Sequence, residues 1–211
     1  MADRMDIFYG IPQNLVQFCL AKIEEGGDTS HNLDHILDVA EDGVFLAELY
    51  ELNPLMFKLA ALVHDIFQAT DREYHHILSS DWARNHLEEY GYSFTVAHRV
   101  ARMCRFHRKS LDPNIRLDAY EEVFARADFG IPGDKMIKRT LQRAVAYSDF
   151  IQEPEETRLS RACVHLRKKY GSEGYARRIY AGEELFAEDV QKMQTFFNNL
   201  TCSDIARILA E

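Results

Sequence analysis

Residues 55–67 read LMFKLAALVHDIF, and this stretch decides the fold. It is apolar almost all round, so we expect it to form a central buried helix. Two polar residues, His64 and Asp65, stand near its C-terminal end. An imidazole and a carboxylate beside a buried run are costly unless they are paired or bind a metal ion. The stretch therefore predicts a helical core with a polar site attached to it.

The segments on both sides of this helix also show helical periodicity. Apolar stripes occur over 12–23 and again over 30–49, where Ser30 is the expected N-cap. Further helices are expected at about 74–90, 93–107, 120–127, 134–150, 155–170, 173–181, 187–200 and 203–209. The alternating apolar pattern of strands is absent from the sequence. We therefore expect an all-α, single-domain helical bundle of about ten helices over residues 1–211.

Composition limits the class of protein. The net charge of −9 over 211 residues argues against non-specific binding to nucleic acid or to anionic membranes. No secretory signal and no apolar run of about 18 residues is seen, so we expect a cytoplasmic protein without a membrane partner. The sequence is compatible with a homo-oligomer as well as with a monomer. The cysteines lack metal-binding spacing and are expected in the core: Cys19, Cys104, Cys163 and Cys202.

The placement of histidines and aspartates suggests a metal site. His31 and His35 are four residues apart and would share one face of a helix. The pair at 64–65 follows on a second helix, and Asp128 ends another semi-apolar segment, VFARA at 123–127. Each residue alone is more often structural, but three different helices can converge on one point. Imidazole and carboxylate together suit Zn, Mn, Fe, Co or Ni.

Three segments resemble a known family: SHNLDHILDV at 30–39, AALVHDIF at 60–67 and ARADFG at 125–130. They are similar to the HD-domain superfamily of metal-dependent phosphohydrolases, whose pattern is H…HD…D on an all-α core. The resemblance covers about residues 28–130. The HNLDHI piece, with LSSDWA at 78–83, is most similar to small predicted HD phosphohydrolases that carry HNxxHI. The helices over about 134–211 carry no recognised motif and would complete the bundle.

The resemblance implies a ligand set and a reaction. The implied metal ligands are His35, His64, Asp65 and Asp128, and the metal would be Mn, Fe, Co, Ni or Zn, with Mg as a further candidate. The implied reaction is attack of a metal-activated water on the phosphorus of a small phosphorylated substrate, with a nucleotide expected. Asp65 would also take part in catalysis, and His31 would contact the phosphate or support a ligand from one turn away.

Other residues are expected to line the pocket. We assign catalytic roles to His76 and His107 and substrate binding to His75, Arg108 and Lys109. The adjacent pair at 75–76 would orient the water, protonate a leaving group or bind a second metal ion; solvated histidines are the alternative. Three arginines spaced i,i+3 on the helix expected at 93–107 should form a solvated face: Arg99, Arg102 and Arg105.

Two positions leave questions open. Arg126 is as consistent with a structural ion pair as with a substrate contact. Gln68 stands where some HD nucleotidases carry a Glu, and an amide is no base, which argues against a deoxynucleoside monophosphatase. Two other classes stay open: a di-iron oxygenase of the same fold, with extra ligands at 75, 76 and 107, and a nucleotide-binding regulator without turnover. The intact H…HD…D set argues against the regulator.

Overall fold

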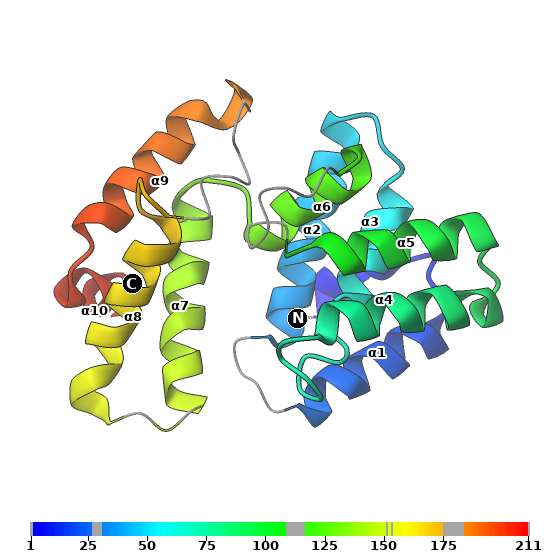
Figure 1. Ribbon diagram of the computed structural model, residues 1–211, viewed down its shortest axis with the longest axis horizontal. Helices are drawn as coiled ribbons and strands as arrows, with labels where there is room; N and C mark the ends of the chain where they lie inside the picture. Colours follow the sequence, from blue (N-terminus) through cyan, green and yellow to red (C-terminus); the bar gives the residue numbers. More distant parts are fainter. Residues whose placement is uncertain are drawn as a thin grey trace. The chain divides into compact units, whose positions relative to one another are not determined.

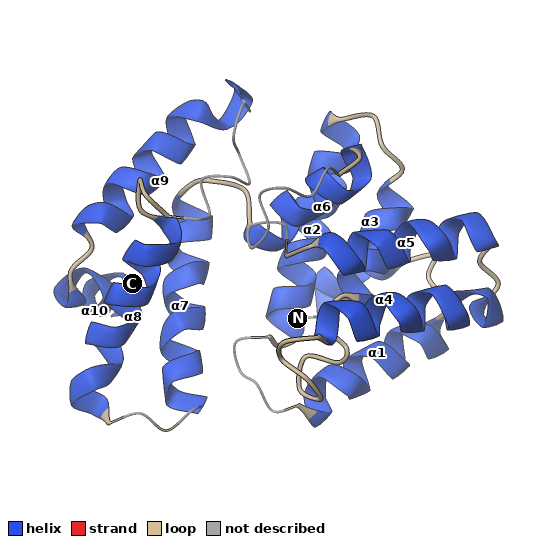
Figure 2. Cartoon of the chain, in the orientation of Figure 1, coloured by secondary structure: helices blue, strands red, loops and turns tan. Residues whose placement is uncertain are grey.

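The computed structural model describes residues 2–26, 31–108, 117–150, 152, 154–174 and 184–210. Every regular element in these residues is a helix, and none is a strand (Figure 1, Figure 2). The all-α prediction is therefore confirmed for the described part of the chain. The chain divides into two compact units, Met1–Gly130 and Ile131–Glu211. The division falls between the motif-bearing region and the C-terminal helices.

The first unit is built around α3 (Pro54–Val63). Its remaining elements are η1 (Ala2–Phe8), α1 (Gln13–Glu25), α2 (Leu33–Leu49), α4 (His75–His86), η2 (Leu87–Tyr90), α5 (Phe94–Phe106) and α6 (Ala119–Phe129). α3 packs against α1, α2, α5 and α6. From Leu59 to Val63 every residue of α3 is fully buried, which confirms the expected central helix.

The helix α3 is shorter than the apolar run that predicts it. It ends at Val63, with His64 as its C-cap, and residues 64–70 form turns. At its start, Asn53 Oδ1 accepts a hydrogen bond from the Leu55 N–H, and Pro54 takes the first helical position. The turn after the helix moves His64 and Asp65 away from the regular helix while keeping them beside the core.

The start of α2 differs from the prediction. The expected cap, Ser30, lies outside the described residues. Asn32 is the N-cap, and its side chain accepts a hydrogen bond from the His35 N–H. His31 therefore precedes the helix, and the expectation that it shares a helix face with His35 is wrong, because the cap lies two residues later than expected.

The second unit contains α7 (Asp134–Phe150), α8 (Glu155–Tyr170), η5 (Glu184–Phe186), α9 (Ala187–Asn199) and α10 (Cys202–Ala210). α8 packs against α7, α9 and α10. Its core includes Leu141, Leu166, Phe197 and Ile205. The expected helix at 173–181 falls mostly on residues 175–183, which lie outside the described part.

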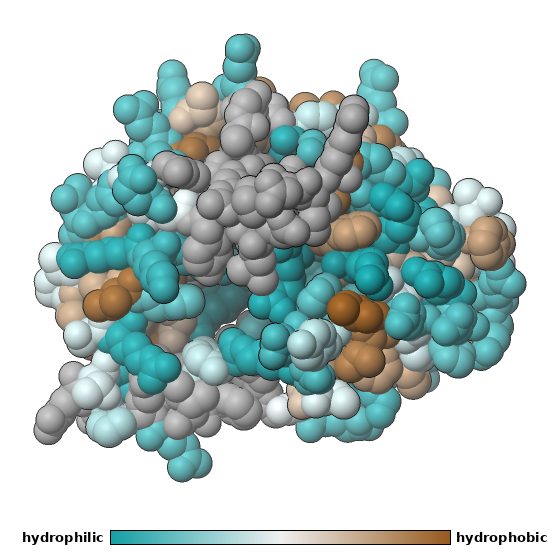
Figure 3. All heavy atoms as spheres, viewed as in Figure 1, coloured by the Kyte–Doolittle hydropathy of each residue, from teal (hydrophilic) through white to brown (hydrophobic). Residues whose placement is uncertain are grey.

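Most surface residues on the face drawn in Figure 3 are hydrophilic, and apolar ones are scattered in small groups. In the described residues, none of the helices combines the length and the apolar character that a membrane crossing requires. Cys19, Cys104 and Cys163 are buried as expected, but Cys202 is exposed because it opens α10 at the surface.

Candidate metal centre

The four expected metal ligands converge from three helices. The Nε2 atoms of His35 and His64 lie 3.2 Å apart. Asp65 Oδ2 is 3.3 Å from His35 Nε2 and 3.2 Å from His64 Nε2. Asp128 Oδ1 approaches the same two atoms, at 3.3 and 3.5 Å. One point is thus surrounded by two imidazoles and two carboxylates.

Helix ends bring these side chains together. His35 lies in the first turn of α2, His64 caps α3, and Asp128 is the penultimate residue of α6. Each of these helices packs an apolar face into the core, and its end brings a polar side chain to the same point. His35, His64 and Asp65 are themselves buried, and the Asp128 side chain is 24% exposed.

A second group of side chains shares Asp65. Its other oxygen, Oδ1, is 3.2 Å from His75 Nε2 and 3.8 Å from His107 Nε2. The two imidazole Nε2 atoms are 3.3 Å apart. His75 opens α4 and His107 is the C-cap of α5. Both groups, His35–His64–Asp65 and Asp65–His75–His107, are compact enough to hold a metal ion.

Backbone carbonyls determine which nitrogen of these rings carries the proton. The Nδ1 atoms of His64, His75 and His107 donate to the carbonyl oxygens of Ala61, Arg72 and Cys104, at 2.9, 2.9 and 2.7 Å. A carbonyl oxygen only accepts, so each Nδ1 must carry the hydrogen. In the neutral ring, Nε2 then presents its lone pair toward Asp65. Such a hydrogen bond typically orients a metal-binding histidine.

The atoms of the second group fit a cation. With both Nδ1 atoms protonated, His75 and His107 direct two lone pairs at each other across 3.3 Å. Asp65 Oδ1, beside them, is buried and has no hydrogen-bond partner among the described residues. Three electron-rich atoms at this separation repel unless a cation lies among them. Neutral imidazoles and a carboxylate suit a divalent transition metal ion.

In the first group, burial and the neighbouring charges shift each pKa in opposite directions, and the neighbouring charges have the larger effect. Burial lowers the pKa of His64, but Asp65 and Asp128 outweigh it and raise the pKa to about 10. Burial raises the pKa of both carboxyl groups, yet the neighbouring imidazoles hold each pKa well below its usual range. Without a metal ion, His64 is therefore the positive partner of two carboxylates.

Histidines 107 and 76 behave differently from His64. Burial lowers the pKa of His107 to about 3. Burial, with the positive charges of Arg108 and Arg105, lowers the pKa of His76 to about 4. Both rings are therefore neutral at neutral pH, as a metal ligand or a proton acceptor must be.

The structure distributes the other expected pocket residues around these groups. The His76 ring centroid is 5.7 Å from that of His75 and 6.3 Å from that of His107. The His31 ring lies perpendicular to the His35 ring at 5.5 Å, so it stays near the site although it precedes the helix. Lys109 lies outside the described residues.

The alternative interpretation of the pair at 75–76, two solvated histidines, does not fit the structure. His75 is buried and His76 is half-buried. Arg126 donates to Tyr50 Oη at 3.2 Å, a contact that favours its structural interpretation. Gln68 is buried, and its backbone N–H donates a hydrogen bond to the Asp65 carbonyl.

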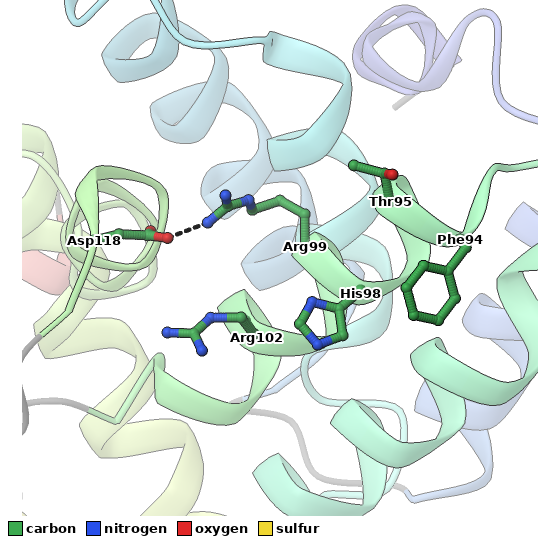
Figure 4. Close-up of a pocket in the computed structure, with 6 residues that line it drawn as sticks. All are labelled: Phe94, Thr95, His98, Arg99, Arg102 and Asp118. Carbon is green, nitrogen blue, oxygen red and sulfur yellow. Dashed lines mark hydrogen bonds and ion pairs between the residues drawn. The ribbon is translucent and has the colours of Figure 1, made fainter.

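The expected solvated face on α5 carries ion pairs. Arg99 pairs with Asp118 and Arg102 pairs with Glu121, and both acids belong to the start of α6. A surface pocket of about 380 Å³ lies beside them (Figure 4). It is lined by Phe94, Thr95, His98, Arg99, Arg102 and Asp118. None of the expected metal ligands lines this pocket.

Comparisons with known proteins bear on the family and the fold of the chain. A family model described as HD domain matches residues 32–149. A crystal structure of a predicted HD superfamily hydrolase from an uncultured Thermotogales bacterium is similar to this chain, with a TM-score of 0.54 and 16% sequence identity over 94% of this chain and 91% of that one. This likeness shows the fold. A search of curated proteins found no match.

Proposed function

Because the chain belongs to the HD-domain family, we propose that it is a metal-dependent phosphohydrolase acting on a small phosphorylated substrate, with a nucleotide as the expected one. The observation that carries the proposal is the position of Asp65. Its two carboxylate oxygens face two different sets of histidine nitrogens, at 3.2–3.3 Å and at 3.2–3.8 Å. A buried carboxylate in this position serves metal binding better than fold stability.

We assign the ligands as two overlapping sets. The first is His35, His64, Asp65 and Asp128; the second is Asp65, His75 and His107. A divalent metal ion bound there supplies a Lewis acid for a phosphoryl oxygen and lowers the pKa of a coordinated water from ~15.7 towards ~7. In this assignment His75 and His107 contribute as ligands, rather than as the substrate-binding and catalytic residues that the sequence alone suggests.

The remaining pocket residues position the substrate and move protons. His76 Nδ1 is buried and has no hydrogen-bond partner among the described residues, so it is available to accept a proton. Arg108 uses one N–H to bind the Glu73 carbonyl at 2.9 Å and keeps its other donors for phosphate oxygens. His31 would contact the phosphate from the side of His35. Together these groups offset the negative charge of the phosphorylated substrate.

A di-iron oxygenase is the second candidate. The group Asp65–His75–His107 favours it, because it offers the additional ligands that a two-metal redox centre needs. Such a centre predicts tightly bound iron and a visible absorption band, whereas a hydrolase predicts turnover of phosphate compounds with redox-inert ions as well.

The test is a metal-by-substrate screen. Metal-stripped protein is supplied with Mn, Co, Ni, Fe, Zn or Mg and tested on nucleoside mono-, di- and triphosphates and on a generic phosphodiester. Asp65→Ala is the blank, and Asp81→Ala, an exposed position on α4, is the matched control. We expect release of phosphate or pyrophosphate by the wild type and the control but not by the blank. No turnover with any metal, or equal turnover by the blank, would refute the proposal.

A further inference from the structure

Four arginines recur at every third position along α5 and just beyond it, at 99, 102, 105 and 108. The two that are farther from the metal centre are neutralised: Arg99 by Asp118 and Arg102 by Glu121. The two nearer ones are not. Among the residues that the structure describes, no carboxylate lies within ion-pair distance of Arg105 or Arg108.

These two arginines lie next to the histidines of the second group. Arg108 directly follows His107, and its hydrogen bond to the Glu73 carbonyl at 2.9 Å ties the end of α5 to the turn before His75. The charges of both Arg105 and Arg108 act on the ring of His76. That ring in turn lies beside the rings of both His75 and His107, with centroids 5.7 and 6.3 Å away. A pair of guanidinium groups thus lies one side chain away from the proposed metal ligands.

The charge of this pair needs an explanation in this protein. The chain has 34 acidic residues against 25 Lys and Arg, so carboxylates for pairing are plentiful. Both arginine residues are half-buried, and two like charges close together without a counter-ion carry an electrostatic cost. A divalent cation in the neighbouring site would add to the positive charge and raise that cost. An anionic ligand that reaches from the metal centre to the arginines would remove it.

We propose that Arg105 and Arg108 bind a second phosphate-type group of the substrate, next to the phosphoryl group that is cleaved. The inference rests on the proposed function and narrows its substrate class. A single phosphoryl group at the His/Asp centre leaves the two arginines without an anionic partner among the described residues. The preferred substrates are therefore compounds with two phosphoryl groups in series, such as nucleoside diphosphates and triphosphates, rather than simple monoesters. Arginine suits this task because its planar fork matches two phosphate oxygens at once.

Binding of two unreactive probes tests the inference without turnover. Metal-loaded protein is titrated with methylenediphosphonate, which carries two phosphonate groups, and with methylphosphonate, which carries one. We expect Arg105→Gln and Arg108→Gln each to weaken diphosphonate binding at least about tenfold, and to change methylphosphonate binding by less than about threefold. Arg99→Gln, on the same helix but paired with Asp118, is the matched control and should bind both probes as the wild type does.

Two further results separate a binding role from a structural one. Arg105→Lys keeps the charge and should recover part of the lost affinity, and each variant should retain the wild-type metal content and far-ultraviolet circular dichroism. Equal loss for both probes, or no loss for either, would overturn the inference. A wild type that prefers the diphosphonate yet hydrolyses nothing would refute the proposed function alone. Hydrolysis that Arg105→Gln lowers equally for mono- and diphosphates would refute this inference and leave the hydrolase.

Discussion

Replacing Asp65 with Asn removes the charge that both ligand sets share while it keeps the shape of the side chain. Asp65 Oδ2 lies 3.2 Å from His64 Nε2, and Oδ1 lies 3.2 Å from His75 Nε2. Two unit charges at the first of these distances attract by about 5 kcal/mol at an effective dielectric constant of about 20. A divalent ion at a similar distance doubles the attraction to about 10 kcal/mol.

Desolvation of the ion and of the carboxylate offsets most of this attraction. If about 3 kcal/mol remains as net binding free energy, its loss raises the metal dissociation constant by about 100-fold. Because the two oxygens serve different sets, we expect Asp65→Asn to weaken every bound metal ion, not one of two. A substitution that affected a single set would leave one ion bound.

The assay is a titration of metal-stripped protein with Mn or Co against a chelating dye, with elemental analysis after desalting. Asp81→Asn is the matched control, since that side chain is 52% exposed and lies at the far edge of ion-pair range from Arg84, at 3.9 Å. We expect wild-type affinity for the control and at least about 100-fold weaker binding for Asp65→Asn. Binding by Asp65→Asn within about threefold of the wild type would refute the reasoning from shared coordination.

Three other predictions concern the second ligand set, the protonation of His64 and the packing around Gly43. His107→Gln should lower bound metal by about one equivalent per chain in elemental analysis, whereas His98→Gln, at an exposed position, should not. Metal loading at about pH 8 should release about one proton, because the raised pKa of His64 keeps that ring protonated in the metal-free protein below about pH 10. Calorimetry in two buffers of different ionisation enthalpy measures the number of protons released. Zero release would contradict the assignment of His64 as a metal ligand. Gly43→Val should lower the free energy of unfolding by about 1–3 kcal/mol, since a Cβ at this position would lie 3.2 Å from Phe57 Cβ; an unchanged urea midpoint would contradict this close contact.

Local sequence signals were sufficient for most helices. The bounds of α7 and α8 match the expected ranges, and Pro154 and Gly171 flank α8 at its start and at its end. The sequence also predicts the cap of α5 at Ser93, because a serine hydroxyl accepts a hydrogen bond from the first turn of a helix. The start of α2 was missed by two residues, since several nearby polar residues can cap a helix and the local sequence does not rank them.

The arginines on α5 show where local reasoning stopped. Their spacing predicts one face of the helix, and a solvated face was expected. Arg99 and Arg102 instead pair with Asp118 and Glu121, each 19 residues further along the chain. Such a pairing depends on where α6 crosses α5, and that crossing is set by the packing of apolar side chains distant in sequence. The difference between paired and unpaired arginines therefore appears only in the folded chain.

The sequence by itself determined the helical class and the four residues H…HD…D that converge at the first ligand set. The helical class follows from helical periodicity, whereas the four ligands are implied by the resemblance of three short segments to the HD-domain superfamily. Only the tertiary structure decided that Asp65 directs its second oxygen to His75 and His107. The physical reason is that a side chain's direction at a helix end depends on the turn that follows it and on the helices packed around it. The residue types indicate which side chains could bind a metal ion, but the packing of the helices determines which ligand atoms lie close together.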